Sequence, residues 1–281
     1  MALFGALVFQ DLKNNNMNNI IKRRRRFLGG VGSYTNAYSI SFDGTNDYFD
    51  TGDPFTTTIR GSFTIGYWIK TTELNTSASE YHLGTFNVSG AMSYFHLSAK
   101  TDGNLLITFK GLTGSAGSWT TNSPVLDTTN GTNGNWMHIA VVVNRPGSGN
   151  ISAKIYINGS EVALTNSTAL SITNQASFDN TGTNLSFAAM RVGTGSTNLY
   201  HVNCKMDEIA IWNASLSDAS MAVVGAGPFN LKAASGNYTN QSDLVSHWRF
   251  IEGENTSVED ATTNSDGTLV NGAAWGTDVP S

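Results

Sequence analysis

The stretch Trp136–Gly159 constrains the fold of this chain more than any other. It contains two runs rich in β-branched and aromatic residues, 137–143 and 151–157, separated by Pro, Gly, Ser and Asn. This pattern predicts an antiparallel hairpin. Both faces of the first run are apolar, which indicates a central strand with a packed layer on each side. Asn158-Gly159 favours a tight turn, so residues 161–164 are expected to fold back as a third short strand.

Alternation of apolar and polar residues indicates strands along much of the remaining chain. We expect them at about 38–42, 62–70, 80–86, 93–99, 105–110, 185–192, 204–213 and 243–250. Residues 111–135 are interpreted as a long polar connection. Ser and Asp precede a short apolar run in 215–224, which predicts one brief helix. With 29 Gly and 5 Pro in 281 residues, the composition is typical of one large all-β domain or two small ones.

Charge divides the chain into a basic N-terminal arm and an acidic body. Residues 1–33 carry six basic residues and one acidic residue, whereas the remainder carries ten basic and twenty acidic residues. The basic run of the arm consists of Lys22, Arg23, Arg24, Arg25 and Arg26, and an apolar tip precedes it. The acidic body is not expected to bind nucleic acid. We interpret the arm as an anchor on a partner protein; a nucleic-acid contact and a solvated tail are the alternatives.

Neither a membrane span nor a secretion signal is expected. No uninterrupted apolar run approaches about twenty residues, and no basic region precedes the apolar start of the chain. The single cysteine, Cys204, excludes an intramolecular disulfide framework. Its position within an apolar strand predicts a buried thiol rather than a reactive one.

Five segments occur in an order that is typical of one protein family. They are Ser41–Tyr48, Phe63–Lys70, Trp136–Val142, Ile155–Gly159 and Met206–Trp212. Together they resemble the laminin-G-like members of the concanavalin A-like lectin and glucanase superfamily, over about residues 38–224. The resemblance implies a jelly-roll sandwich of two antiparallel sheets with no obligatory chemistry. We therefore expect an all-β, concanavalin A-like sandwich with one short helix and an extended N-terminal arm.

The C-terminal segment departs from this family order. Leu244–Phe250, Asp266–Leu269 and Trp275 resemble the opening segment of many such domains, yet here they close the chain. This order is similar to that of domains found in tailed-bacteriophage structural proteins. We expect the segment to pack against the strand near Tyr38, as in a circular permutation. The predicted organisation is an arm at 1–36, a sandwich at 37–230, and a C-terminal segment at 231–281 that packs back on the sandwich.

The carboxylates do not indicate glycosidase chemistry. Glucanases of this superfamily place acid and nucleophile on alternate positions of one strand, whereas Asp207 and Glu208 are adjacent. We therefore predict that the chain is not an enzyme and requires no cofactor.

A structural Ca²⁺ held by Asp43, Asp47 and Asp207 is left open, because these short carboxylates lie near turns. Strand parity places Asp207 on the same inward face as Ile209, where a carboxylate needs hydrogen-bond donors or a cation. The alternative to a metal is that the first two residues form turns and that Asp207 accepts backbone N–H bonds.

Glycan binding is the common use of this superfamily, through aromatic rings that stack on sugars. Strand parity or loop position makes Trp68, Trp119, Tyr200 and Trp212 the candidates. The alternative is that most of them are core residues, since all-β sandwiches bury their tryptophans.

Two functional hypotheses follow. The first is a non-enzymatic structural or decoration protein of a virion, made in the host cytoplasm without a signal peptide. It would sit on the capsid or tail surface, anchored to other subunits by its arm, as a homo-oligomer or an assembly-bound chain with host-surface glycans as an additional partner. The second is a free carbohydrate-binding lectin, or a binding module of a glycan-processing system. The basic arm distinguishes them, because a free lectin needs no anchor.

Overall fold

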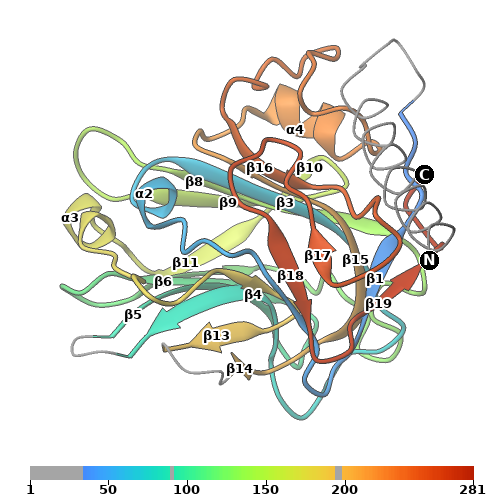
Figure 1. Ribbon diagram of the computed structural model, residues 1–281. Helices are drawn as coiled ribbons and strands as arrows, with labels where there is room; N and C mark the ends of the chain where they lie inside the picture. Colours follow the sequence, from blue (N-terminus) through green and yellow to red (C-terminus); the bar gives the residue numbers. More distant parts are fainter. Residues whose placement is uncertain (1–33, 89–91, 194–197) are drawn as a thin grey trace, which may run out of the picture. The chain divides into compact units, whose positions relative to one another are not determined.

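The computed structural model describes residues 34–88, 92–193 and 198–281. The chain divides after Thr35, and Asn36–Ser281 form one folded unit (Figure 1). The basic run Lys22–Arg26 lies outside the described residues. Two sheets of mostly antiparallel strands face each other, so the predicted all-β sandwich is confirmed. In the described part of the chain, no helix has the length and apolar character needed to cross a membrane.

Sheet A forms the upper layer in Figure 1 and contains the hairpin that organises the sequence. From one edge to the other, its strands are β10 (Ser160–Val162), β9 (Ser152–Ile157), β8 (Met137–Asn144), β3 (Phe63–Lys70), β15 (Asn203–Trp212), β1 (Ser39–Asp43) and β19 (Ala274–Gly276). A further strand, β16 (Leu244–Trp248), pairs with the second half of β15.

Sheet B forms the lower layer. Its strands follow the order β11 (Leu164–Thr168), β7 (Gly117–Thr121), β6 (Leu105–Lys110), β5 (Ser93–Ala99), β4 (Glu80–Asn87), β12 (Ser186–Phe187), β2 (Tyr48–Asp50), β18 (Gly267–Val270) and β17 (Ser257–Val258). The short hairpin of β13 (Met190–Val192) and β14 (Asn198–Leu199) continues the same edge of β4, where β13 runs parallel to β4.

The inward-facing side chains of both sheets form the main core. In β3 these are Phe63, Ile65, Tyr67 and Ile69, as the alternation predicts. Phe63 meets Phe95 of sheet B edge to face, with ring centroids 5.3 Å apart. Each such fully buried side chain contributes about 1.5–3 kcal/mol relative to an exposed one. Burial of alternate residues therefore fixes the register of each strand.

The hairpin of β8 and β9 is covered on both faces, as its sequence predicts. Ile139, Val141 and Val143 face the main core, while Ala140 and Val142 belong to a second apolar cluster on the outer side of sheet A. Helix α4 (Asp218–Val224) and the residues on either side of it complete that cluster with Leu216, Met221, Val224, Leu231 and Tyr238. Asn158 and Gly159 both have positive φ, at +49° and +79°, which makes the expected tight turn into β10.

The predicted helix is α4 (Asp218–Val224), and Ser217 caps it by accepting a hydrogen bond from the backbone N–H of Ser220. Two further helical turns, α2 (Thr56–Ile59) and α3 (Ile172–Ala176), were not expected. They are too short to show a helical period, so no sequence pattern marks them.

The C-terminal segment is part of both sheets. β19 pairs with β1 through Trp275 and Ile40, and the Trp275 ring meets Tyr38 edge to face at 6.3 Å. The C-terminal segment therefore lies against the strand that follows Tyr38. β18 pairs with β2 in sheet B. The domain boundaries at 36 and 230 stay predictions.

Two local predictions were wrong. The connection 111–135 contains strand β7, which pairs with β6 and buries Trp119 opposite Ile107. Asp207 does not share the face of Ile209, because β15 has a bulge: the ladder with β3 breaks after Asp207, and Glu208 takes the extra position at φ +49°. Asp207 is nevertheless fully buried. Cys204 is buried as predicted, and burial raises the pKa of its thiol well above the usual value.

Candidate functional site: an aromatic face on sheet B

The three tryptophans predicted to bind glycans are buried, which corrects that prediction. Trp119 lies in the main core between the sheets. Trp212 is fully buried in the second cluster and donates a hydrogen bond from Nε1 to the Tyr238 hydroxyl at 3.0 Å. Trp68 is 7% exposed. Trp68 and Trp212 both line a cavity of about 10 Å³ beneath the α4 layer, which admits one water and no sugar ring. Strand alternation places these two rings on the outer face of sheet A, but helix α4 and the residues after it cover that face.

Tyr200, the fourth candidate, is 48% exposed and lies on the outer side of sheet B. Its backbone carbonyl accepts a hydrogen bond from the N–H of Tyr81 at 3.0 Å, which fixes it beside β4. The φ angle of Tyr200 is +62°. A non-glycine residue in this region carries strain of about 1–3 kcal/mol, and such strain clusters at functional sites.

Alternation in β4 and β5 turns further rings to the same side. Phe95 and Leu97 face the core. Tyr94, which precedes Phe95, and His96, which lies between the two core residues, therefore face outward. Gly84 lies opposite His96 and Phe86 lies opposite Tyr94. A register shift between Tyr81 and Leu83 lets Tyr81 face outward as well. We call the set of Tyr81, Phe86, Tyr94, His96 and Tyr200 the aromatic face.

These five rings form a continuous row. Tyr200 stacks on Tyr81 with centroids 4.8 Å apart and planes at 28°. Tyr81 contacts His96 at 4.6 Å, and His96 stacks with Tyr94 at 6.0 Å and 25°. Phe86 meets Tyr94 edge to face at 5.2 Å. Each aromatic pair adds about 0.5–1.5 kcal/mol beyond its buried area. The row is therefore pre-organised, and a ligand need not order it on binding.

The aromatic face presents hydroxyl groups at its surface. The phenols of Tyr81, Tyr94 and Tyr200 make no side-chain hydrogen bond with the part of the chain that the structure describes. Partial burial raises the pKa of the Tyr81 phenol, and the neighbouring phenols of Tyr200 and Tyr94 raise it further. Burial raises the pKa of the Tyr94 phenol too, so the Tyr81 and Tyr94 hydroxyls stay protonated at neutral pH. Each can donate to and accept from a ligand hydroxyl.

His96 keeps the centre of the row uncharged. It is 7% exposed, and burial lowers its pKa to about 3. Its Nδ1 atom is buried without a hydrogen-bond partner among the described residues. A neutral imidazole packs between two phenol rings without the cost of burying a charge.

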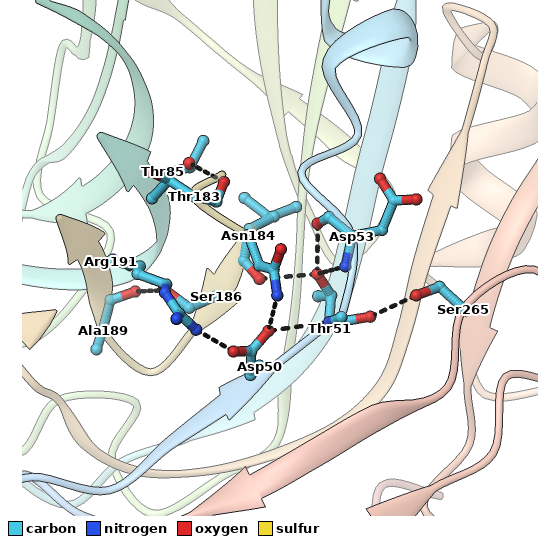
Figure 2. A network of polar contacts seen from close by, with 12 residues as sticks. Asp50, Thr51, Asp53, Thr85, Thr183, Asn184, Ser186, Ala189, Arg191 and Ser265 are labelled. Atoms are coloured by element: carbon cyan, nitrogen blue, oxygen red, sulfur yellow. Dashed lines mark hydrogen bonds and ion pairs between the residues drawn. The ribbon is translucent and has the colours of Figure 1, made fainter. Parts of the chain in front are cut away.

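Figure 2 shows a polar network around Asp50 and Arg191. Asp50 is linked by cross-strand pairing through Ser186 and Gly84 to His96, so all four belong to one row of sheet B. Its Oδ1 atom accepts from Asn184 Nδ2 at 2.8 Å, and its Oδ2 atom accepts from Arg191 Nη1. The Arg191 side chain is 18% exposed. The Asp50 carboxylate thus holds the Arg191 guanidinium in place.

The structure does not bring the three candidate calcium ligands together. Asp43 accepts from the backbone N–H of Thr45 at 2.7 Å, and Asp47 accepts from the N–H of Asp43 at 3.2 Å. Asp207 lies further along β15 and accepts from the N–H of Glu208 at 2.8 Å. This is the turn-forming alternative considered for these residues. Across the described residues, no cluster of three His, Cys, Asp or Glu side chains suits a metal ion.

The sequence of this chain matches a known protein family, and its fold is similar to solved structures. A model of the concanavalin A-like lectin/glucanases superfamily matches residues 43–222. No curated protein sequence shows significant similarity.

Similar solved structures have low sequence identity and therefore report on the fold alone. A Bacteroides ovatus protein assigned to carbohydrate binding is 19% identical, with a TM-score of 0.59 over 88% of this chain and 62% of that one. This chain therefore spans less than two thirds of that protein. A heptameric SAP-like pentraxin from Limulus polyphemus is 14% identical, with a TM-score of 0.52 over 88% of this chain and 97% of that chain. A CBM40 module of the Ruminococcus gnavus IT-sialidase, bound to α2,3-sialyllactose, is 17% identical, with a TM-score of 0.50 over 66% and 96% of the two chains.

Proposed function

Because this chain belongs to the concanavalin A-like lectin/glucanase superfamily, we propose that it is a carbohydrate-binding protein whose ligand lies on the aromatic face of sheet B. The observation that carries this proposal is the row of five rings, whose three surface hydroxyls lack partners among the described residues. Sugar-binding sites combine such aromatic surface with a few oriented polar groups. The carbohydrate-binding proteins with similar folds support it further.

We propose that binding proceeds without catalysis. The outward positions of β4, β5 and β6 are Tyr81, Gly84, Phe86, Tyr94, His96, Ser98, Leu106, Thr108 and Lys110. None of them is a carboxylate, and glycoside hydrolysis commonly requires two carboxylates flanking the scissile bond. The ligand is therefore held and released unchanged.

A glycan array probed with the full chain tests the proposal, followed by calorimetry on the best ligand. Tyr200→Ala and Tyr81→Ala should each weaken binding about tenfold, the loss of about 1.4 kcal/mol. Tyr200→Phe keeps the stacking ring, so it should retain most of the affinity and isolate the contribution of the hydroxyl. Glu161→Gln, an exposed change on sheet A, is the matched control and should bind like the original chain. Binding that survives both alanine variants would refute the site.

A second candidate function is favoured by the charge of the arm. Residues 1–33 have a net charge of +5 beside a body of −10, which suits attachment to an acidic partner surface. In this proposal the chain decorates a virion and displays the sandwich outward, with Lys22–Arg26 as the anchor. Isolation of the native particle should find the chain on it, and replacing Arg23, Arg24, Arg25 and Arg26 by Ala should release it. Unchanged occupancy would exclude this anchor.

A further inference from the structure

A cation stands beside the aromatic face without an acidic partner in the described part of the chain. Lys110 is the outward residue at the end of β6 and lies directly opposite Tyr94 of β5. Its Nζ atom donates to the carbonyl oxygens of Met92 at 2.7 Å and of Gly111 at 3.2 Å. An ammonium has three N–H donors. Two carbonyls therefore hold Nζ near Tyr94, and one donor is left for a ligand.

Four other lysines in the sheets or directly beside them differ from Lys110, because each has an acidic partner. Lys70, Lys100, Lys154 and Lys205 each lie within 3.1 Å of a carboxylate oxygen. Arg191, another cation on this side of sheet B, is paired with Asp50. Among the described residues, no salt bridge involves Lys110. Its charge thus stands apart from the carboxylates of a body that carries an excess of ten acidic residues.

We propose that the aromatic face selects glycans that carry an anionic substituent, a carboxylate or a sulfate ester, and that Lys110 binds this group while the sugar ring lies against Tyr94. This inference rests on the proposed glycan-binding function and adds the class of ligand. The carbonyls of Met92 and Gly111 position the ammonium before the ligand arrives, so little side-chain freedom is lost on binding. A hydrogen bond between an ammonium and an anionic oxygen is about twice as strong as a neutral one.

The expected selectivity is about tenfold for an anionic glycan over its neutral parent. A partly exposed ion pair alone supplies a factor of about two to five, and the charge-assisted hydrogen bond supplies the rest. The preference should shrink as salt rises from about 0.05 M to about 0.5 M, because the pair is accessible to counterions. Affinity that comes from ring stacking should be insensitive to this change.

The test is an array that pairs neutral galactans, lactosides and glucans with their uronate, sialylated and sulfated counterparts. The full chain should bind at least one anionic member about tenfold more tightly than its neutral parent, and the uronate, sialylated and sulfated arms tell carboxylate from sulfate. Lys110→Gln should abolish the difference and leave neutral binding unchanged, whereas Lys110→Arg should restore it. Because glutamine can still donate to the Met92 carbonyl, the melting temperature of Lys110→Gln should stay near that of the original chain.

Lys100→Gln is the matched control, since Lys100 directly follows β5 of sheet B but is paired with Asp102. This variant should keep the full preference. Equal binding of neutral and anionic glycans, or a preference that survives Lys110→Gln, would overturn the inference and leave glycan binding intact. Failure to bind any member of the array would refute the proposed function, and the inference would fall with it.

Discussion

Removal of Trp248 tests whether the C-terminal segment is a structural part of the sandwich. Trp248 is fully buried in β16 and packs against Phe49 and Phe55, with ring centroids 5.4 and 6.0 Å away. Its Nε1 atom donates to the carbonyl of Ser265 at 2.9 Å. Trp248→Ala should remove about 3–5 kcal/mol by leaving a cavity, and the unpaired Ser265 carbonyl should add about 1 kcal/mol. The total approaches the lower end of the about 5–15 kcal/mol by which domains are stable.

Urea unfolding followed by far-ultraviolet circular dichroism measures this loss as a fall in the midpoint at constant slope. Trp248→Phe retains most of the ring contacts and should lose less than half as much. Trp275→Ala is a comparison on the same segment, since that ring is only half-buried, and it should cost about 1–2 kcal/mol. A loss below about 1 kcal/mol for Trp248→Ala would refute the reasoning, because a segment that merely lies on the sandwich would contribute no core.

Further predictions concern charge and metal. Hydrogen bonds and ion pairs with Lys205 and Lys70 lower the pKa of Asp278 to about 2, so its stabilising contribution is present above about pH 4 and is lost as pH falls toward 2. Asp278→Asn should therefore make the urea midpoint less dependent on pH in that window. An unchanged pH profile would contradict this prediction. Burial lowers the pKa of His138 to about 3, so protonation of this side chain in the unfolded chain should reduce stability as pH falls from about 6.5 to 3. Calorimetric melts of His138→Gln over this range should show a pH dependence of stability that is smaller by the uptake of one proton. A chelator should leave the melting temperature unchanged, because the candidate carboxylates accept hydrogen bonds from backbone N–H groups; a shift would reveal a metal.

The sequence predicts the strands of this sandwich well where only one face of a strand is buried. In Phe63–Lys70 the apolar residues alternate strictly because one side faces the other sheet and the neighbours fix the register. The strand at Gly117–Thr121 has no such alternation, because Trp119 is its one large apolar residue. The bulge at Glu208 has no signal either, since a glutamate with positive φ has no compositional marker.

The candidate site was harder to predict than the fold. Trp212 has outward parity, yet α4 and Tyr238 cover it, and no local pattern tells an open sheet face from a covered one. The signal for Tyr94 and His96 was present, because they alternate with the core residues Phe95 and Leu97. Tyr81 could not be assigned, since the register shift in β4 sets its direction. Tyr200 was expected from its loop position and is exposed.

Nuclear magnetic resonance of the full chain with ¹³C-labelled tyrosine rings tests the central claim most directly. Titration with the best array ligand should shift the ring signals of Tyr81, Tyr94 and Tyr200, which line the aromatic face. The rings of Tyr67 and Tyr238, which are fully buried elsewhere, should not respond. Shifts confined to the buried rings, or saturable binding with no change at the three surface tyrosines, would contradict glycan binding on sheet B.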